Sequence, residues 1–330
     1  MWSPTVTVAI PTLRRPGYLL ETLASVLGQS YPNLQIIVSN DACDDQTTEA
    51  MRAIDDPRIL FLENRGGSIG MIANWNRCVD AAEGKYFVLV GDDDRIGPKF
   101  VEAMVGVFED REDVIVGVCP QEVIDAGGQV VRRLAWPTDR YLPGRRFVLE
   151  RYSGKHQYVT MVSAFYRTTQ LKDITGFPAF ALGANSDNGV VIRLAPRGVV
   201  GFAAEALFQY RVYEASWGLT AYRSIAKSVS ELLSYISTDE VRAAYGDTEF
   251  RTLHRKVAAA GVRDYLGRIN AYFLRDHSLA EVWREVMQHG LVSDPRLRLL
   301  YLLALPKTFV RLAALKLGLP AGSVSKRLPR

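Results

Sequence analysis

Short runs of β-branched and other apolar residues alternate with stretches of helical periodicity through the first 120 residues of the chain. The runs predict buried strands at 6–10, 34–38, 59–62, 86–90 and 114–118. The stretches between them predict helices at 18–27, 47–54, 69–82 and 98–108. Strands that alternate with helices indicate crossover connections. The sequence therefore predicts an α/β fold with a mostly parallel central sheet flanked by helices.

The pattern changes after residue 120 and again after residue 220. We predict a hairpin turning at 125–128, a loop over the Pro-, Gly- and Arg-rich segment 136–154, a strand at 160–166, a helix at 188–194 and a strand at 208–212. From residue 222 onward the periodicity is helical, at 225–236, 239–259, 262–275, 279–288 and 296–317. We expect one domain at 1–220, with halves at 1–120 and 121–220, and a helical C-terminal region at 221–330.

Composition limits the class of protein. The chain has 330 residues, which suits one large or two modest domains. Its three cysteines are scattered and lack a C-x-x-C spacing, which argues against a disulfide framework or a zinc site and fits a reducing compartment. The first residues show no basic segment followed by an apolar one, so no secretory signal is expected. We therefore expect a cytoplasmic protein.

Charge is distributed unevenly around a formal net value of +4. Residues 221–330 contain 18 Lys and Arg against 10 Asp and Glu. A solvated helical surface explains this excess, and so does an anionic partner such as the inner face of a membrane. The cations and the proline in 296–317 argue against a spanning helix. A core-packing helix and an interfacial amphipathic helix that gives peripheral membrane contact both remain open.

Three adjacent carboxylates, Asp92, Asp93 and Asp94, directly follow the fourth predicted strand. In an open α/β sheet, ligands bind at the carboxyl ends of the strands. Adjacent carboxylates repel one another and resist desolvation unless a cation compensates them. A hard divalent ion such as Mg²⁺ or Mn²⁺ suits such a cluster, because it also accepts phosphate oxygens. An exposed acidic loop that helps to start the next helix is an equally good explanation of the run taken alone.

Polar residues also follow the first two strands. Asp41 can accept from a base N–H or a ribose hydroxyl, or serve in turn and cap chemistry. Arg14 and Arg15 suit a diphosphate, or a solvated surface. No G-x-G-x-x-G follows the first strand, which argues against a dinucleotide-dependent oxidoreductase.

In combination, the motifs resemble family-2 glycosyltransferases with the GT-A fold, over about residues 5–215. The acidic run stands where that family carries its Asp-x-Asp. The other matching motifs are Pro11-Thr12, Val38-Ser39-Asn40-Asp41-Ala42-Cys43-Asp44-Asp45, Asn64-Arg65-Gly66-Gly67, Asn74-Trp75-Asn76 and Ala82-Glu83-Gly84-Lys85-Tyr86.

The resemblance implies roles for individual residues. Asp94 is implied as the direct ligand of a Mn²⁺ or Mg²⁺ ion, with Asp92 beside it. Asn76 is implied as a contact in the nucleotide cleft, and Asn74 is an alternative to it in that role. Many family members carry Arg-x-His where this chain has Arg211-Val212-Tyr213, so Arg211 either meets the diphosphate or pairs with a surface acid. The implied nucleotide-sugar contacts are Pro11, Thr12, Arg14, Asp41, Arg65, Asn76, Asp92, Asp93 and Arg211.

The catalytic base implied by the resemblance is Asp187. Ser186 stands in place of the glutamate that usually precedes the base. The alternative for Asp187 is to cap the helix that follows it.

The resemblance implies an inverting, metal-dependent glycosyltransferase, with residues 1–120 as the nucleotide-sugar half and 121–220 as the acceptor half. By family habit the donor is a UDP- or dTDP-sugar, and the acceptor is a saccharide or lipid-linked saccharide in cell-surface polysaccharide or glycolipid synthesis. Nucleic acid is not expected as a partner. A nucleotidyltransferase on a related fold and a non-catalytic sugar- or nucleotide-binding protein are the alternatives.

Overall fold

The chain divides into two compact units in a computed structural model. The N-terminal unit comprises residues 1–151 and 156–213, and the C-terminal unit comprises residues 152–155 and 214–330. The structure describes residues 5–42, 46–134, 139–156, 160–180, 183–213 and 222–268.

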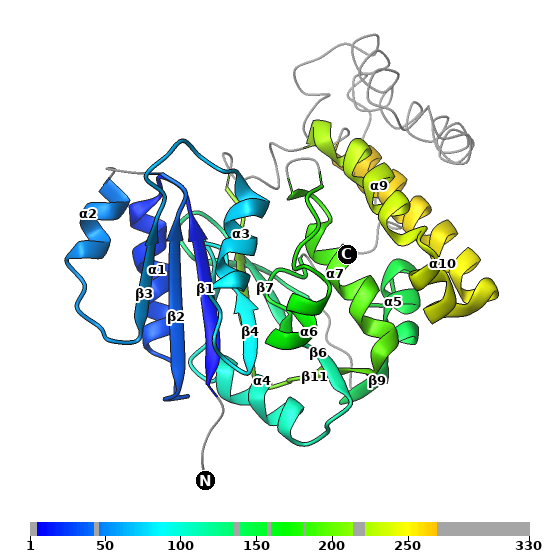
Figure 1. The fold of residues 1–330 in the computed structure, drawn as a ribbon, viewed down its shortest axis with the longest axis horizontal. Coiled ribbons are helices and arrows are strands. Elements are labelled where there is room, and N and C mark those ends of the chain that lie inside the picture. The colour runs from blue at the N-terminus through cyan, green and yellow to red at the C-terminus, as the bar shows by residue number, and fades with distance from the viewer. Residues whose placement is uncertain are drawn as a thin grey trace. The chain divides into compact units, whose positions relative to one another are not determined.

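The N-terminal unit is built on two sheets (Figure 1). The large sheet has the order β3-β2-β1-β4-β10-β6-β11-β9, and the small one has the order β5-β12-β7-β8. The strands of the large sheet are β1 (Val6–Thr12), β2 (Leu34–Asn40), β3 (Ile59–Glu63), β4 (Tyr86–Leu89), β6 (Val114–Val118), β9 (Tyr141–Pro143), β10 (Phe165–Arg167) and β11 (Val199–Phe202). Those of the small sheet are β5 (Arg95–Ile96), β7 (Gln121–Ile124), β8 (Val130–Arg133) and β12 (Phe208–Arg211).

The predicted α/β class with a mostly parallel sheet is confirmed. In the large sheet β1 pairs in parallel with β2 and β4, β2 with β3, and β6 with β11. The two antiparallel additions are β10, between β4 and β6, and β9, at the edge beside β11. Every residue of β1 is buried, as expected for a central strand covered on both faces.

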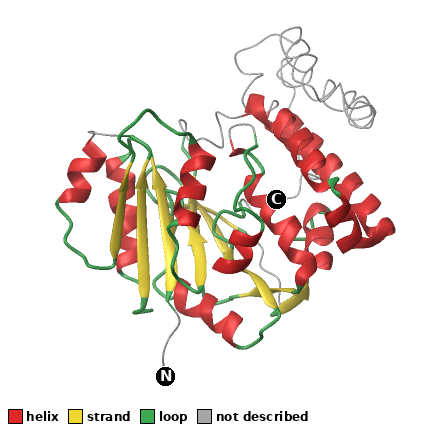
Figure 2. Cartoon of the chain, viewed as in Figure 1, coloured by secondary structure: helices red, strands yellow, loops and turns green. Residues whose placement is uncertain are grey.

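Helices pack on both faces of the large sheet (Figure 2). Alternate residues of a strand point to opposite faces. Val8 and Ile10 of β1 join one core cluster with Leu23 of α1 and Phe100 of α4. On the other face, Ser39 of β2 bonds to Asn74 of α3. The helices of this unit are α1 (Pro16–Leu27), α2 (Gln46–Arg52), α3 (Met71–Asp80), α4 (Phe100–Glu109), α5 (Gly144–Tyr152), α6 (Thr168–Asp173), α7 (Ser186–Leu194) and the 3₁₀ turn η2 (Ala195–Arg197).

The prediction of a loop at 136–154 is wrong where the structure describes this segment, because β9 and α5 lie there. Phe147 and Val148 of α5 are buried. Gly144, which suggested a loop, is the first residue of α5. The backbone of Ala195 passes so close to it that a Cβ at this position would collide with that backbone. The strand predicted at 160–166 is short and starts only at Phe165, and β5, β11 and α6 were not predicted.

The small sheet brings distant segments of the chain together at the acidic run. The predicted hairpin is confirmed as β7 and β8, which pair antiparallel. β12 lies between β7 and β5, and β5 directly follows the acidic run. Arg211 at the end of β12 is thereby held next to Asp94.

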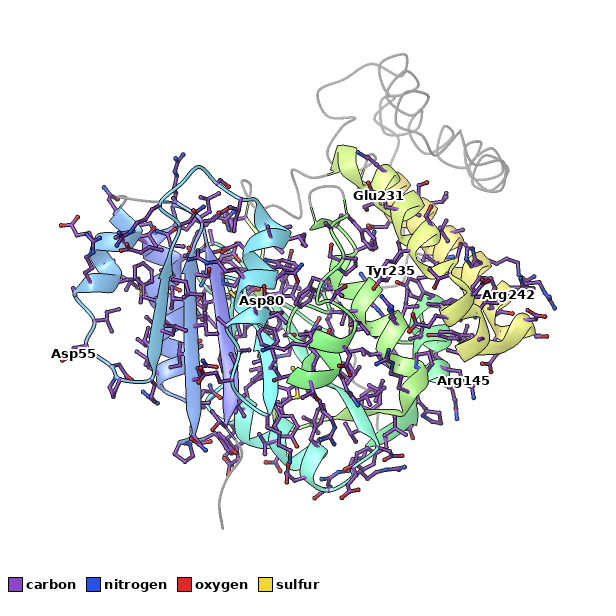
Figure 3. The ribbon with its side chains drawn as sticks, in the orientation of Figure 1. Asp55, Asp80, Arg145, Glu231, Tyr235 and Arg242 are labelled. Carbon is purple, nitrogen blue, oxygen red and sulfur yellow. The ribbon has the colours of Figure 1, made fainter. Side chains whose placement is uncertain are left out.

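The C-terminal unit is helical where it is described, as α9 (Tyr222–Ile236) and α10 (Asp239–Arg268). Figure 3 shows Glu231 and Tyr235 on α9 and Arg242 on α10. A Cβ on Gly261 of α10 would lie 2.5 Å from Val229 of α9, so the two helices pack closely. Among the helices that the structure describes, none is both long and apolar enough to cross a bilayer. The helices predicted at 279–288 and 296–317 lie outside the described residues.

Candidate functional site

The carboxyl ends of β1 and β4 meet beside the acidic run. Directly after β4, Val90 donates its backbone N–H to the carbonyl of Ala9 in β1 at 2.8 Å. Pro11 is buried in β1. Thr12 ends the strand, and its hydroxyl donates to Oδ2 of Asp92 at 2.7 Å. The structure thus joins Thr12 and Asp92, two predicted site residues that lie 80 positions apart.

Asp92 is a buried carboxylate, with a residue exposure of 7%. Burial raises its pKa to about 6, and the neighbouring Asp93 carboxylate acts in the same direction. Arg15 and the hydroxyl of Thr12 oppose this rise, because both favour the charged form. At neutral pH the Asp92 carboxylate is therefore charged at a cost in free energy, which an additional cation would reduce.

Asp94 is also buried, and its surroundings disfavour its charge more strongly. Burial raises its pKa well above the usual range, and the carboxylates of Asp93 and Asp92 add to this effect. The backbone N–H of Arg211 donates to Oδ1 of Asp94 at 2.9 Å and partly offsets the rise. A Cβ on Gly91 would lie 2.7 Å from Oδ2 of Asp94, so this close turn requires glycine.

The acidic run fits a divalent cation that binds together with a diphosphate. Asp92 and Asp94 offer hard carboxylate oxygens, the donors that Mg²⁺ and Mn²⁺ prefer. Across the part of the chain that the structure describes, no group of three or more His, Cys, Asp or Glu side chains could hold a metal ion. A cation held by one or two carboxylates needs no such group, because phosphate oxygens and water complete its coordination. A bound cation would favour the charged form of Asp94 and so offset the burial that raises its pKa.

Asp93 is held between a cation and a tyrosine. Its Oδ2 accepts from Nη1 of Arg15 at 3.0 Å and from the hydroxyl of Tyr213 at 3.2 Å. Burial and the Asp93 carboxylate raise the pKa of Tyr213, so its hydroxyl remains a donor. The ring of Tyr213 lies 5.1 Å from that of Tyr18. The residue that stands where many family members carry a histidine therefore bonds to the acidic run.

Arg15, rather than Arg14, contacts the acidic run. Its Nη1 lies 3.2 Å from Oδ1 of Asp92 as well as 3.0 Å from Oδ2 of Asp93. Arg14 is exposed, with a backbone φ of 55°. The chemistry of both cations suited a diphosphate, and the resemblance implied Arg14 as the contact. Their different directions depend on the turn that leads into α1.

The side chain of Arg211 is enclosed within the N-terminal unit. Its guanidinium donates from Nε to the carbonyl of Asp93 at 2.7 Å, from Nη1 to the carbonyl of Ala126 at 2.8 Å, and from Nη2 to Glu21 at 2.7 Å. It also lies 4.8 Å from the ring centre of Tyr18. Of the two roles that the sequence left open, pairing with an acid is the one present in this structure. Glu21 was not predicted.

Asp41 is saturated with hydrogen bonds from the loop that precedes α3. Its carboxylate accepts from Ser68 Oγ, from the backbone N–H groups of Ile69 at 2.8 Å and Gly70 at 3.0 Å, and from Asn64 Nδ2 at 3.1 Å. These bonds outweigh burial and lower the pKa of Asp41. A carboxylate offers about four acceptor sites, so all of them are used. These bonds fix the 64–70 loop, whereas the turn and cap role that the sequence left open concerned the helix predicted at 47–54.

The remaining predicted contacts of the nucleotide half have other neighbours in this structure. The side chain of Arg65 is 89% exposed, and its nearest acid, Glu63, lies 3.8 Å away. Asn76 bonds twice to the backbone of Phe177, at 2.9 and 2.8 Å. Asn74 bonds to Ser39 through both ends of its amide. These asparagines connect α3 to the 176–177 turn and to β2, respectively.

Asp187 lies in the first turn of α7 and faces the segment around residue 160. Its Oδ2 accepts from the backbone N–H of Met161 at 2.8 Å and from the hydroxyl of Thr160 at 3.2 Å. Its Oδ1 accepts from the backbone N–H of Asn188 at 2.8 Å. The neighbouring Ser186 is fully buried, and its hydroxyl has no hydrogen-bond partner among the residues that the structure describes. Asp187 is therefore a fixed, buried carboxylate, with one hydroxyl among its donors.

A family model described as glycosyl transferase family 2 matches residues 7–173, slightly more than half of the chain. An uncharacterised glycosyltransferase of Rickettsia prowazekii (strain Madrid E) is 33% identical over 127 residues. That match covers 38% of this chain and 39% of the relative, so the chain spans about two-fifths of the relative's length.

Two solved structures have a similar fold. S. aureus TarS, residues 1–349 in complex with UDP-GlcNAc, has a TM-score of 0.64 at 14% identity, over 96% of this chain and 92% of that chain. The mannosyltransferase PcManGT of Pyrobaculum calidifontis, in complex with GDP-Man and Mn²⁺, has a TM-score of 0.50 at 15% identity, over 95% and 87% of the two chains. At these identities the similarity concerns the fold alone, and it confirms the predicted GT-A architecture.

Proposed function

The chain belongs to glycosyl transferase family 2, and we propose that it is an inverting enzyme that moves a sugar from a nucleoside-diphosphate sugar to a hydroxyl group. The observation that supports this most is the junction of Thr12, Asp92 and Asp94 at the carboxyl ends of β1 and β4. Sites at this position in an open α/β sheet bind ligands. Buried carboxylates there suit a cation and the diphosphate that the cation neutralises.

Asp94 and Asp92 would hold the cation, Mn²⁺ or Mg²⁺, as the family and the Mn²⁺ complex of PcManGT suggest. The bound cation would stabilise the negative charge that develops on the leaving diphosphate. Thr12 orients Asp92 through its 2.7 Å hydrogen bond. Arg211 fixes Asp94 through its backbone N–H and Asp93 through its guanidinium. The chain's own contribution is therefore a preorganised acidic edge.

Asp187 would act as the base. In a single displacement, the acceptor oxygen forms a bond to the anomeric carbon while the bond from that carbon to the diphosphate oxygen breaks. The nucleoside diphosphate leaves with the electron pair, and the acceptor proton passes to Asp187. Among the groups that donate to Asp187, the hydroxyl of Thr160 at 3.2 Å is chemically the most similar to the hydroxyl of a sugar acceptor. Attack from the face opposite the leaving group inverts the anomeric centre.

We propose a uridine or thymidine nucleotide as the donor, with Asp41 as the acceptor of the base imide N–H. TarS, of similar fold, was solved with UDP-GlcNAc. Because Asp41 already accepts four hydrogen bonds, base recognition would require one of these donors to leave. Asn64, at 3.1 Å, is the longest of them. Pro11, Arg14, Arg65 and Asn76 remain proposals for the nucleotide cleft, although their side chains do not contact the acidic run in this structure.

The acceptor would be a saccharide or lipid-linked saccharide, handled by residues 121–220, with the helical region 221–330 as a separate domain. The excess of cations in 221–330 supports peripheral contact with an anionic membrane surface. Co-sedimentation with anionic liposomes tests this. Equal binding by the full chain and by a variant that ends at Asp294 would remove the membrane argument.

A thermal-shift screen tests the donor directly. The probes are UDP-, dTDP- and GDP-sugars, each with Mn²⁺ and with EDTA. A ligand at 100 times its Kd stabilises the native state by about 2.7 kcal/mol, which is a shift of roughly 5–11 °C for a domain of about 150–250 residues. We expect one donor class to produce such a shift with Mn²⁺ only. If no nucleotide sugar shifts the melting point of the full chain, the proposal is wrong.

A further inference from the structure

A half-exposed arginine pairs with two carboxylates of the acidic run and partly compensates their charge. Nη1 of Arg15 pairs with Asp92 at 3.2 Å and with Asp93 at 3.0 Å. Its side chain keeps 34% of its exposure, whereas the Asp92 and Asp93 side chains keep only 9% and 16%. Burial opposes the charge on Arg15, but the two carboxylates outweigh this effect and raise its pKa. Arg15 is therefore a permanent cation that covers the acidic run on its solvent side.

Most of the donor capacity of Arg15 is unused. A guanidinium has five N–H donors in a planar fork that matches phosphate geometry. In the described part of the chain, both hydrogen bonds of Arg15 leave from Nη1, and its Nε and Nη2 make none. Arg211 differs, because its Nε, Nη1 and Nη2 all donate and its side chain is fully buried. Of these two arginines, only Arg15 has unused donors on a half-exposed side chain, where a ligand can reach them.

A cation and Arg15 would compete for Asp92, the carboxylate that both would contact. If Asp92 and Asp94 take up a divalent ion, the negative charge that attracts Arg15 is largely neutralised, and its guanidinium is no longer needed there. A diphosphate bound at the same edge brings new negative charge within reach of its free donors. Bidentate Arg–phosphate pairs are among the stronger charge-assisted hydrogen bonds.

We propose that Arg15 is an exchangeable counter-ion, which neutralises Asp92 and Asp93 in the ligand-free protein and binds the donor diphosphate when a divalent ion takes its place. This inference rests on the proposed function and assigns a diphosphate contact to a residue adjacent to the one that the sequence favoured. Arg15 then affects two binding affinities in opposite directions. Arg15 weakens the binding of the metal alone and strengthens the binding of a diphosphate with the metal.

Two binding measurements on the full chain test this, using Arg15→Ala, Arg15→Lys and Arg14→Ala. The affinity for Mn²⁺ alone is measured by electron paramagnetic resonance of the free ion. The affinity for UDP and for inorganic pyrophosphate, with saturating Mn²⁺, is measured by calorimetry, and uridine serves as the probe without a diphosphate. Arg111→Ala, which removes a surface cation paired with Asp113, is the matched control.

We expect Arg15→Ala to bind Mn²⁺ alone about 3- to 10-fold more tightly than the wild type. We expect it to bind UDP and pyrophosphate with Mn²⁺ about tenfold more weakly, with uridine unchanged. Arg15→Lys keeps the charge but loses the fork, so its Mn²⁺ affinity should stay near the wild-type value while its UDP affinity falls less than in Arg15→Ala. A variant that is merely misfolded would bind both ligands more weakly.

The inference is overturned if Arg15→Ala binds Mn²⁺ alone no more tightly than the wild type, because Arg15 is then a fixed structural ion pair. It is also overturned if Arg14→Ala, and not Arg15→Ala, weakens UDP binding. Both results leave the proposed function intact, since wild-type binding of UDP with Mn²⁺ persists. If the wild type binds neither UDP nor pyrophosphate, the proposed function fails together with this inference.

Discussion

The buried side chain of Arg211 should stabilise the fold without touching the donor. Replacing it by alanine removes a guanidinium that donates to the carbonyls of Asp93 and Ala126 and to the carboxylate of Glu21. Removing one partner of a buried charge pair typically costs about 3–5 kcal/mol. Glu21 keeps 44% of its side-chain exposure and Ala126 is exposed, so water can replace part of what is lost. We therefore expect Arg211→Ala to lower the free energy of unfolding by about 2–4 kcal/mol.

Urea denaturation followed by tryptophan fluorescence measures this change. Arg133→Ala is the control, because Arg133 pairs with Glu122 on the surface while its own side chain is 76% exposed, and exposed pairs contribute at most about 1 kcal/mol. Arg211→Met fills the same space without charge and separates packing from hydrogen bonding. The hydrogen bond to Asp94 comes from the backbone N–H of Arg211 and persists in each variant.

UDP affinity provides the second half of the test. Under conditions in which Arg211→Met is folded, its UDP affinity with Mn²⁺ should stay within about threefold of the wild type, because the guanidinium of Arg211 is fully buried and four of its five N–H donors are already used. The reasoning is refuted by a combination of two results. The free energy of unfolding of Arg211→Met would lie within about 0.5 kcal/mol of the wild-type value, and its UDP affinity would nevertheless fall about tenfold. Arg211 would then contact the diphosphate directly, as the sequence also allowed.

Three further predictions concern the carboxylates. Asp187→Asn should lower kcat by about 10²–10⁴-fold with UDP affinity nearly unchanged, and equal kcat values would remove Asp187 as the base. Asp94→Asn should weaken Mn²⁺ binding at least tenfold in the presence of UDP, whereas unchanged binding would place the cation elsewhere. In EDTA, the pKa of Asp92 is about 6 in the folded chain and 3.8 in the unfolded chain. Between these two pH values the unfolded chain binds fewer protons than the folded chain, so the free energy of unfolding falls as the pH rises. Asp92→Asn should flatten that decline in urea midpoints between pH 4 and 7, and superimposable profiles would contradict the pKa shift.

The sequence alone predicted which strand ends lie together at the site. The two strands that end beside the acidic run, β1 and β4, are buried and largely apolar, and their parallel register places Thr12 and Asp92 at one edge. The family motifs supplied the roles. Neither source pointed to Arg15 as the arginine at the acidic run, because its direction depends on the backbone of a single turn, where Arg14 has a φ of 55°.

One further error has a tertiary origin. Gly144 belongs to α5 because the chain there passes close to Ala195, which no local pattern records. The ligand contacts at Asp41 and Asn76 stay predictions, and in this structure the hydrogen bonds of these residues are made to a loop and a turn whose positions depend on the whole unit. Polar residues near a site can bind ligand or fix the loops that surround it, and only the contacts distinguish these roles.

The release of nucleoside diphosphate tests the central claim most directly. The full chain is incubated with Mn²⁺ and a panel of UDP-, dTDP- and GDP-sugars, and both nucleoside diphosphate and pyrophosphate are quantified. We predict that one donor yields nucleoside diphosphate, that EDTA stops its release, and that Asp94→Asn and Asp187→Asn reduce it at least 100-fold, the lower end of the usual general-base effect. Release of pyrophosphate instead, or a rate of nucleoside diphosphate release that is the same in wild type, Asp94→Asn and Asp187→Asn, would contradict the assignment of this acidic edge to glycosyl transfer.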